Sequence, residues 1–178
     1  MPDQIDLKLL FLDTAFFEDG AIIRGGTLIT DIETRPYEFR CTGPVKPTSL
    51  QRMLYGDTLE EYIQVELIGV PLITLTKEKP NLVLLRNVGL LRVRPRIPYP
   101  AVLIQRDSKL TANASAEVRL VTIVSHREFA QEAAMAQERL APLMQRRDLL
   151  EPFERLQVAL AEAHRRHIGE DSAGKAHA

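Results

Sequence analysis

Short apolar runs in the first quarter of the chain predict three β-strands. LKLLFLD (7–13) is nearly continuous in apolar residues and is followed by a turn-like EDG (18–20), which is typical of a buried strand. AIIRGGTLITD (21–31) places β-branched residues on both sides of a glycine pair. It predicts one strand with a glycine bulge, or else two strands around a tight turn. YEFRCTG (37–43) alternates apolar and polar residues, so we expect a third, half-buried strand that completes a meander.

Helical patterns occupy the middle of the chain. Prolines end the meander, and a short helix is predicted over SLQRMLY (49–55), with Gly56 to close it. Residues 58–77 fit both a helix and a strand hairpin. The capping-box pattern at 57–60 favours the helix, which we expect to kink near Pro71 because proline lacks the N–H of a helical hydrogen bond.

Buried strands are predicted in the third quarter. Apolar runs indicate strands over residues 81–87, 101–107 and 118–125. Between the first two, RVRPRIPYP (92–100) holds three prolines and three arginines, which indicates an exposed and extended connector. The polar segment 108–117 is expected to be a loop.

Two helices are predicted at the end of the chain. Ser125 and Glu128 form a capping-box pattern for a helix that runs towards Leu140 and stops near Pro142. A second helix follows from residue 149, with apolar residues four and three apart that share one face. This apolar stripe consists of Leu149, Phe153, Leu156, Leu160 and Ala163. A narrow stripe has to be buried, either against the chain's own sheet or against another protein molecule.

Together these elements predict an α+β fold with a mixed sheet, a central helical region and a C-terminal helical pair. We expect residues 1–125 to form an α/β core domain. Residues 126–169 are expected to form the helical pair, packed on this core or on a partner, and residues 170–178 a disordered tail.

The composition narrows the class of protein. With 178 residues, 45% of them hydrophobic and 26% charged, the chain has the balance of a soluble globular protein. A formal net charge of -1 provides no global attraction for nucleic acid or an anionic membrane. Cys41 is the only cysteine, which excludes intrachain disulfides and thiolate zinc clusters. The N-terminus lacks the pattern of a signal peptide and no stretch is apolar enough to span a bilayer, so we expect a cytoplasmic protein without a membrane partner.

Carboxylates on the predicted strands are candidates for chemistry. Asp13 ends the first strand and Glu38 lies on the third, and Glu66 lies in the helical region. Clustered carboxylates hold Mg²⁺ in nucleases and phosphotransferases, because that ion prefers oxygen ligands. We therefore take these three as the candidate catalytic residues. The alternative is that they are solvated residues of turns and surfaces.

The order of elements, three strands, a helix and then buried strands, resembles the ribonuclease H-like fold over residues 6–125. That family has acids on the first strand, on the first long helix, at the end of the fourth strand and on a late helix. The resemblance implies that Asp13 stands at the first place, and one of Glu60, Glu61 or Glu66 at the second.

The remaining two acid positions of the family are the end of the fourth strand and the late helix. Asn87 stands where the acid at the end of the fourth strand belongs, so one charged ligand is missing there. Glu128 or Glu132 stands at the late helix. This departure weakens the expectation of catalysis more than the expectation of the fold.

The proline-rich connector combines arginines with an aromatic residue. Basic residues and an aromatic ring on an extended segment can follow a phosphate backbone and stack a base. The nucleic-acid-binding candidates are Arg92, Arg94, Arg96 and Tyr99. The alternative is an exposed loop that arginine keeps soluble.

Our leading interpretation is a non-enzymatic subunit or adaptor whose C-terminal helices bind another protein or a second copy of the chain. It rests on the incomplete catalytic set, the low net charge and the long amphipathic end. The first alternative is a magnesium-dependent nuclease or phosphoryl-transfer enzyme of ribonuclease H-like build. The second is a nucleic-acid-binding accessory protein. Only the nuclease needs Mg²⁺; otherwise we expect no cofactor.

Overall fold

A six-stranded mixed sheet forms the centre of the protein, for which a computed structural model describes residues 6–107 and 121–170. The strands lie in the order β3-β2-β1-β4-β5-β6. Their bounds are β1 Leu9–Phe17, β2 Ile22–Thr30, β3 Pro36–Cys41, β4 Leu82–Leu85, β5 Ala101–Arg106 and β6 Val121–Ser125. The predicted loop 108–117 and most of the predicted tail lie outside the described residues.

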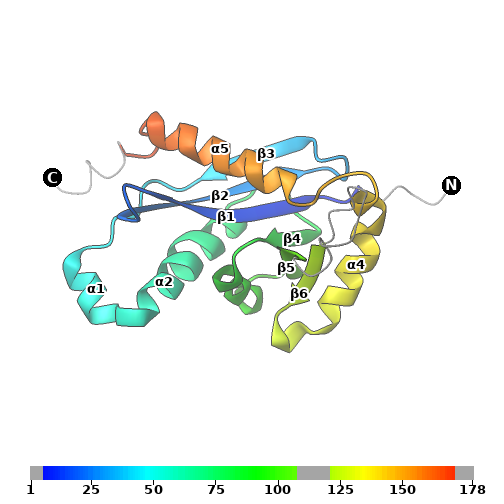
Figure 1. Cartoon of the computed structure of the whole chain (residues 1–178), viewed down its shortest axis with the longest axis horizontal. Helices are drawn as coiled ribbons and strands as arrows, with labels where there is room; N and C mark the ends of the chain where they lie inside the picture. The colour runs from blue at the N-terminus through cyan, green and yellow to red at the C-terminus, as the bar shows by residue number, and fades with distance from the viewer. Residues whose placement is uncertain (1–5, 108–120, 171–178) are drawn as a thin grey trace.

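Helices cover both faces of this sheet (Figure 1). The α-helices are α1 Ser49–Tyr55, α2 Leu59–Tyr62, α3 Val70–Thr74, α4 Gln131–Met144 and α5 Glu151–Arg165. The other helical segments are η1 Gly56–Thr58, η2 Ile63–Gly69, η3 Val88–Arg96 and η4 Arg127–Phe129, of which η2 is a π-helix and the others are 3₁₀-helices. Helix α5 lies along β1 and β2, whereas α1 projects away from the sheet (Figure 1).

The predicted meander is confirmed. Strand β2 pairs antiparallel with both β1 and β3. Strands β1, β4 and β5 run parallel to one another, and β6 returns antiparallel to β5. The glycine pair lies inside one continuous strand, as preferred, but it makes no bulge, because the register shift falls between Ile29 and Thr30.

The glycine pair of β2 instead lets a helix approach each face of the sheet. A Cβ atom on Gly25 would lie 2.0 Å from Cγ2 of Ile68 in η2. One on Gly26 would lie 2.8 Å from Cδ2 of Leu160 in α5. A side chain at either position would push a helix away from the sheet.

The apolar stripe of α5 is buried against the chain's own sheet. It joins Leu9 and Phe11 of β1 in one core cluster, and the rings of Phe11 and Phe153 meet edge to face with centroids 5.2 Å apart. All five stripe residues, Leu149, Phe153, Leu156, Leu160 and Ala163, are buried. The partner interface considered for this stripe is therefore part of the core, and the stripe is not available to another protein.

A fully buried arginine holds the C-terminal end of α5. Arg24 of β2 donates from Nε to Nδ1 of His164, at 3.1 Å, and from Nη1 to the carbonyl oxygens of Thr42 and Ile168, at 3.1 and 2.6 Å. The ring of His164 stacks on Phe17 of β1 with centroids 4.0 Å apart. These contacts fix how α5 lies along the sheet.

The segment between residues 58 and 77 is helical, which confirms the helix and excludes the hairpin. The backbone widens into η2, where the N–H of Val70 donates to the carbonyl of Val65. Pro71 then falls in the first turn of α3, directly after the π-helical segment, which continues into α3 without a break. The predicted kink thus takes the form of a π-helical turn.

Two boundaries and one segment differ from the sequence predictions. The expected extended connector is largely the 3₁₀-helix η3, because Leu90 and Val93 turn into the core and shorten the path. Helix α4 continues through Pro142 to Met144. The predicted cap Ser125 is replaced by His126, whose Nδ1 accepts from the N–H of Glu128 at the start of η4, and α4 itself begins after Ala130 without a side-chain cap. No helix in residues 6–107 and 121–170 is long and apolar enough to cross a membrane.

Replacing Phe153 tests the burial of the stripe. We expect Phe153→Ala to lower the free energy of unfolding by about 3–5 kcal/mol, because a fully buried ring leaves a cavity. Val158 lies on the same helix but is 71% exposed, so Val158→Ala should stay within about 0.5 kcal/mol of the original protein. Denaturant melts of both variants make the measurement. Equal, small effects would show that α5 does not cover the sheet.

Candidate functional site

Asp13 lies at the centre of the sheet beside the point where β4 ends, a position that we call the gap beside β1. Strand β4 pairs with β1 only from Leu9–Leu82 to Leu12–Leu85, so Asp13 is the first residue of β1 beyond the end of β4. Its neighbours Phe11 and Ala15 belong to the core cluster under α5, which places the side chain of Asp13 on the α5 face. The residue is nevertheless only 4% exposed.

Three partners satisfy the carboxylate of Asp13. Nη2 of Arg86 lies 2.7 Å from Oδ2. Nε2 of Gln157 donates to the same oxygen at 2.8 Å and to the carbonyl of Thr14 at 2.9 Å. The N–H of Thr14 donates to Oδ1 at 2.9 Å. Asp13, Arg86 and Gln157 form what we call the Asp13 network.

Each member of the Asp13 network comes from a different element. Arg86 is the first residue after β4, so the end of that strand delivers its side chain to the gap beside β1. Gln157 lies on α5 next to the buried stripe and reaches the sheet from above. The guanidinium of Arg86 also lies over the ring of Phe153, 5.5 Å from its centroid, and the Arg86 side chain is 35% exposed.

The residues of this site do not fit a magnesium ion. Asp13 is the only carboxylate of the network, and a cation at its Oδ2 would meet the positive charge of Arg86. The end of β4 supplies Arg86 and Asn87 where the ribonuclease H-like pattern needs an acid, and the residue that α5 brings to Asp13 is the amide Gln157. Within the described parts of the chain no three His, Cys, Asp or Glu residues are grouped so as to hold a metal.

The other two catalytic candidates are held elsewhere. Glu38 on β3 pairs with Arg40 and accepts from the backbone N–H groups of Lys77 and Glu78, at 3.0 and 2.8 Å. Burial raises the pKa of the Glu38 carboxyl, but these hydrogen bonds outweigh it and hold that pKa below its ordinary value. Glu66 on η2 pairs with Arg96 at the surface. The structure thus gives Asp13, Glu38 and Glu66 separate sets of partners.

The late-helix candidate Glu132 has a structural role. Its carboxylate accepts from Nε and Nη2 of Arg94, at 2.6–2.9 Å, and from the N–H of Ala101 at 3.2 Å. The guanidinium of Arg94 lies 3.7 Å from the ring centroid of Phe129. This buried ion pair ties α4 to η3 and β5. The candidate Glu132 is therefore not part of the Asp13 network, to which α5 contributes Gln157 instead.

The four nucleic-acid-binding candidates do not form one open strip. Arg94 is 12% exposed and committed to Glu132. Tyr99 is partly buried against the core. Arg92 and Arg96 remain at the surface, where they pair with Glu61 and Glu66. The three arginines lie on η3, a helix with an inward face, and Tyr99 follows it and packs against the core.

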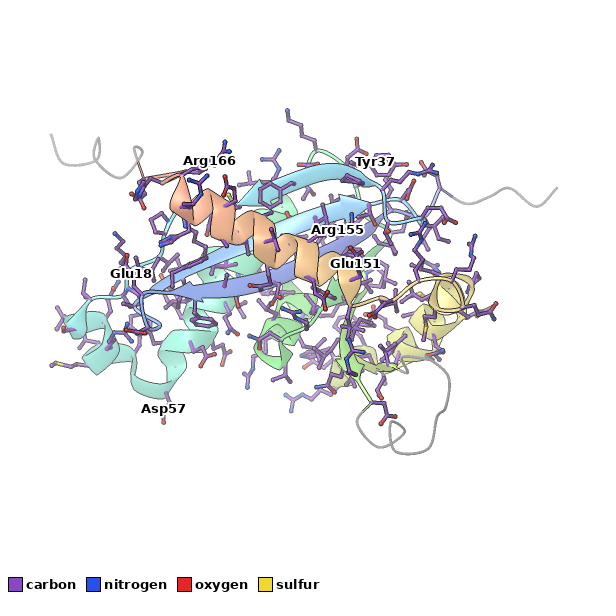
Figure 2. The ribbon with its side chains drawn as sticks, turned by 45° about the horizontal axis from the view of Figure 1, so that its top comes forward. Glu18, Tyr37, Asp57, Glu151, Arg155 and Arg166 are labelled. Carbon is purple, nitrogen blue, oxygen red and sulfur yellow. The ribbon has the colours of Figure 1, made fainter. Side chains whose placement is uncertain are left out.

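A separate hollow of about 510 Å³ opens at the start of α5. Its lining residues are Thr34, Arg146, Arg147, Asp148, Glu151 and Arg155. Glu151 and Arg155 lie at one end of α5 and Arg166 at the other (Figure 2). Arg155 pairs with Glu151 at 2.9 Å and donates to the carbonyl of Thr34, and Arg146 pairs with Glu33 at 2.9 Å. The arginines of this hollow are thus paired with Glu151 of its lining and with Glu33 beside it.

Comparison with solved structures gives a similar fold. Human ENDOV aligns over 90% of this chain and 85% of its own, with a TM-score of 0.59 and 15% sequence identity. The fold is ribonuclease H-like. Ciona intestinalis endonuclease V, solved with a 24mer DNA that contains an inosine followed by a ribo-adenosine, aligns over 76% of this chain and 56% of its own, at 12% identity and a TM-score of 0.39. Searches against family models and curated protein sequences find no match.

The likeness to human ENDOV corrects the leading functional interpretation. The interpretation as a non-enzymatic adaptor acting through protein contacts was wrong, because the chain shares its fold with human ENDOV over 90% of its length and the stripe meant for a partner is buried. The nuclease alternative agrees better with this comparison. The sequence resemblance to ribonuclease H-like proteins is confirmed at the level of the fold.

Replacing Asp13 separates a hydrogen-bonded network from a metal site. In Asp13→Asn, an NH₂ group replaces one carboxylate oxygen and faces the N–H donors that surround it. Arg86 also loses its counter-charge. We expect a loss of about 1–3 kcal/mol in the free energy of unfolding. A metal site of crowded carboxylates would instead give an unchanged or higher melting temperature, because removing one charge relieves repulsion. Asp57→Asn, at an exposed acid (Figure 2), is the control and should have little effect.

Proposed function

We propose that this chain binds nucleic acid through its ribonuclease H-like fold. The observation that carries the proposal is the likeness to human ENDOV over 90% of the chain. Since a fold hosts many functions, the proposal is tied to one site, the gap beside β1 that holds the Asp13 network. The location we propose is cytoplasmic, where Cys41 would stay a free thiol.

The residues around Asp13 favour a protein that binds nucleic acid without cleaving it through a metal ion. Asp13 already has a cation beside it in Arg86, and its neighbours on α5 and after β4 are an amide and a guanidinium. A nuclease that uses Mg²⁺ needs oxygen ligands converging on the ion. The described residues offer one carboxylate there, so we assign no step to a metal.

Metal-dependent cleavage is the second candidate. Besides the fold, one observation favours it: the side chain of Arg86 is 35% exposed, so it has room to turn towards solvent and release Asp13. Under this alternative, cleavage requires Mg²⁺ or Mn²⁺ and is lost in Asp13→Asn. Glu38 and Glu66 would then have to leave their present partners to act in the same centre.

A panel of single- and double-stranded DNA and RNA tests the proposal. Fluorescence anisotropy should detect binding at low salt that weakens as salt rises, because released counterions drive such binding. The affinity should be the same in EDTA and in Mg²⁺, and gels should show no cleavage. No binding to any member of the panel at low salt would overturn the proposal. Cleavage that depends on added Mg²⁺ or Mn²⁺ would replace it with the nuclease alternative.

A further inference from the structure

We propose that Arg86 is the phosphate-binding group of this site and works without a metal ion. The proposal rests on the proposed binding of nucleic acid and names the contact that would hold one phosphodiester. In a nuclease of this build the central carboxylate recruits a cation to the gap beside β1. Here the chain supplies its own cation in the form of a guanidinium.

The guanidinium of Arg86 is fixed on its inner side. Nη2 lies 2.7 Å from Oδ2 of Asp13, which is itself held by Gln157 and by the N–H of Thr14. The ring of Phe153 lies beneath the guanidinium and is fully buried. A charged group held in this way loses little side-chain entropy when it binds a ligand.

The guanidinium donors of Arg86 that do not face Asp13 are available to a ligand. Arginine has five N–H donors, and the ion pair with Asp13 uses one of its nitrogens. No acceptor among the described residues contacts Nε or Nη1 of Arg86. With 35% of the side chain exposed, these donors can meet a ligand that approaches the gap.

The charge of the site suits a phosphodiester. Arg86 neutralises the buried carboxylate of Asp13, which would otherwise repel an anion. The planar fork of a guanidinium binds two oxygens of one phosphate, a geometry that lysine cannot reproduce. The ligand class is therefore a phosphate diester of a nucleic acid strand, bound in a metal-independent way.

The salt dependence of binding to a labelled single-stranded oligonucleotide, measured in EDTA, tests this contact. Arg86→Gln should reduce the slope of log K against log salt by about 0.7 and weaken binding roughly fivefold at ~0.1 M salt. Arg86→Lys keeps the charge but loses the fork, so it should keep the slope and still bind more weakly than the original protein. Arg139→Gln, at an exposed arginine of α4, removes the same charge elsewhere and should change neither quantity.

A second variant covers the risk that Arg86→Gln disturbs the fold by leaving Asp13 unpaired. The double variant Asp13→Asn with Arg86→Gln carries no unpaired charge in the site, and it should show the same loss of slope. Unchanged slopes in both variants, with normal binding by the original protein, would overturn the inference and leave the proposed function standing. Binding that disappears in EDTA would also overturn it. If the original protein binds no oligonucleotide at all, the proposed function itself fails.

Discussion

The buried ion pair between Asp13 and Arg86 is the interaction on which the site depends. A carboxylate removed from water costs several kcal/mol unless charged and polar partners replace its hydration. At Asp13 these partners come from the end of β4, from α5 and from the backbone of β1 itself. The pair therefore links the position of α5 to the point where β4 stops. If Arg86 were lost, the buried charge of Asp13 would keep only the hydrogen bonds from Gln157 and Thr14.

The same backbone geometry that gathers acids in a nuclease gathers other groups here. Because β4 ends beside Leu12, the residues that follow it reach the gap at Asp13. Gly26 lets α5 approach the sheet and Arg24 fixes the far end of that helix, so Gln157 lies over the same gap. The fold brings β1, the end of β4 and α5 together beside Asp13. The side chains that these elements carry there determine whether the site binds a metal ion or a phosphate.

The sequence predicted the elements well because hydrophobic periodicity is local. The meander, the helix before Pro71 and the stripe of α5 all follow from spacings of two, three or four residues. Contacts between distant residues were not predictable in this way. Gln157 reaches Asp13 across 144 positions, and Arg94 turns inward to a glutamate 38 positions away. The sequence held only weak signals of the contacts to Asp13. One was the charged Arg86 directly after a buried strand, and the other was the uncharged Gln157 beside the apolar stripe.

The most direct test of a metal-free site is a crystal structure of the protein grown with Mn²⁺, with anomalous scattering recorded for manganese. Our account predicts no anomalous peak near Asp13, with Nη2 of Arg86 still bound to its carboxylate. A manganese peak on Asp13, with the side chain of Arg86 turned away, would contradict the account and show that the site is a metal centre after all.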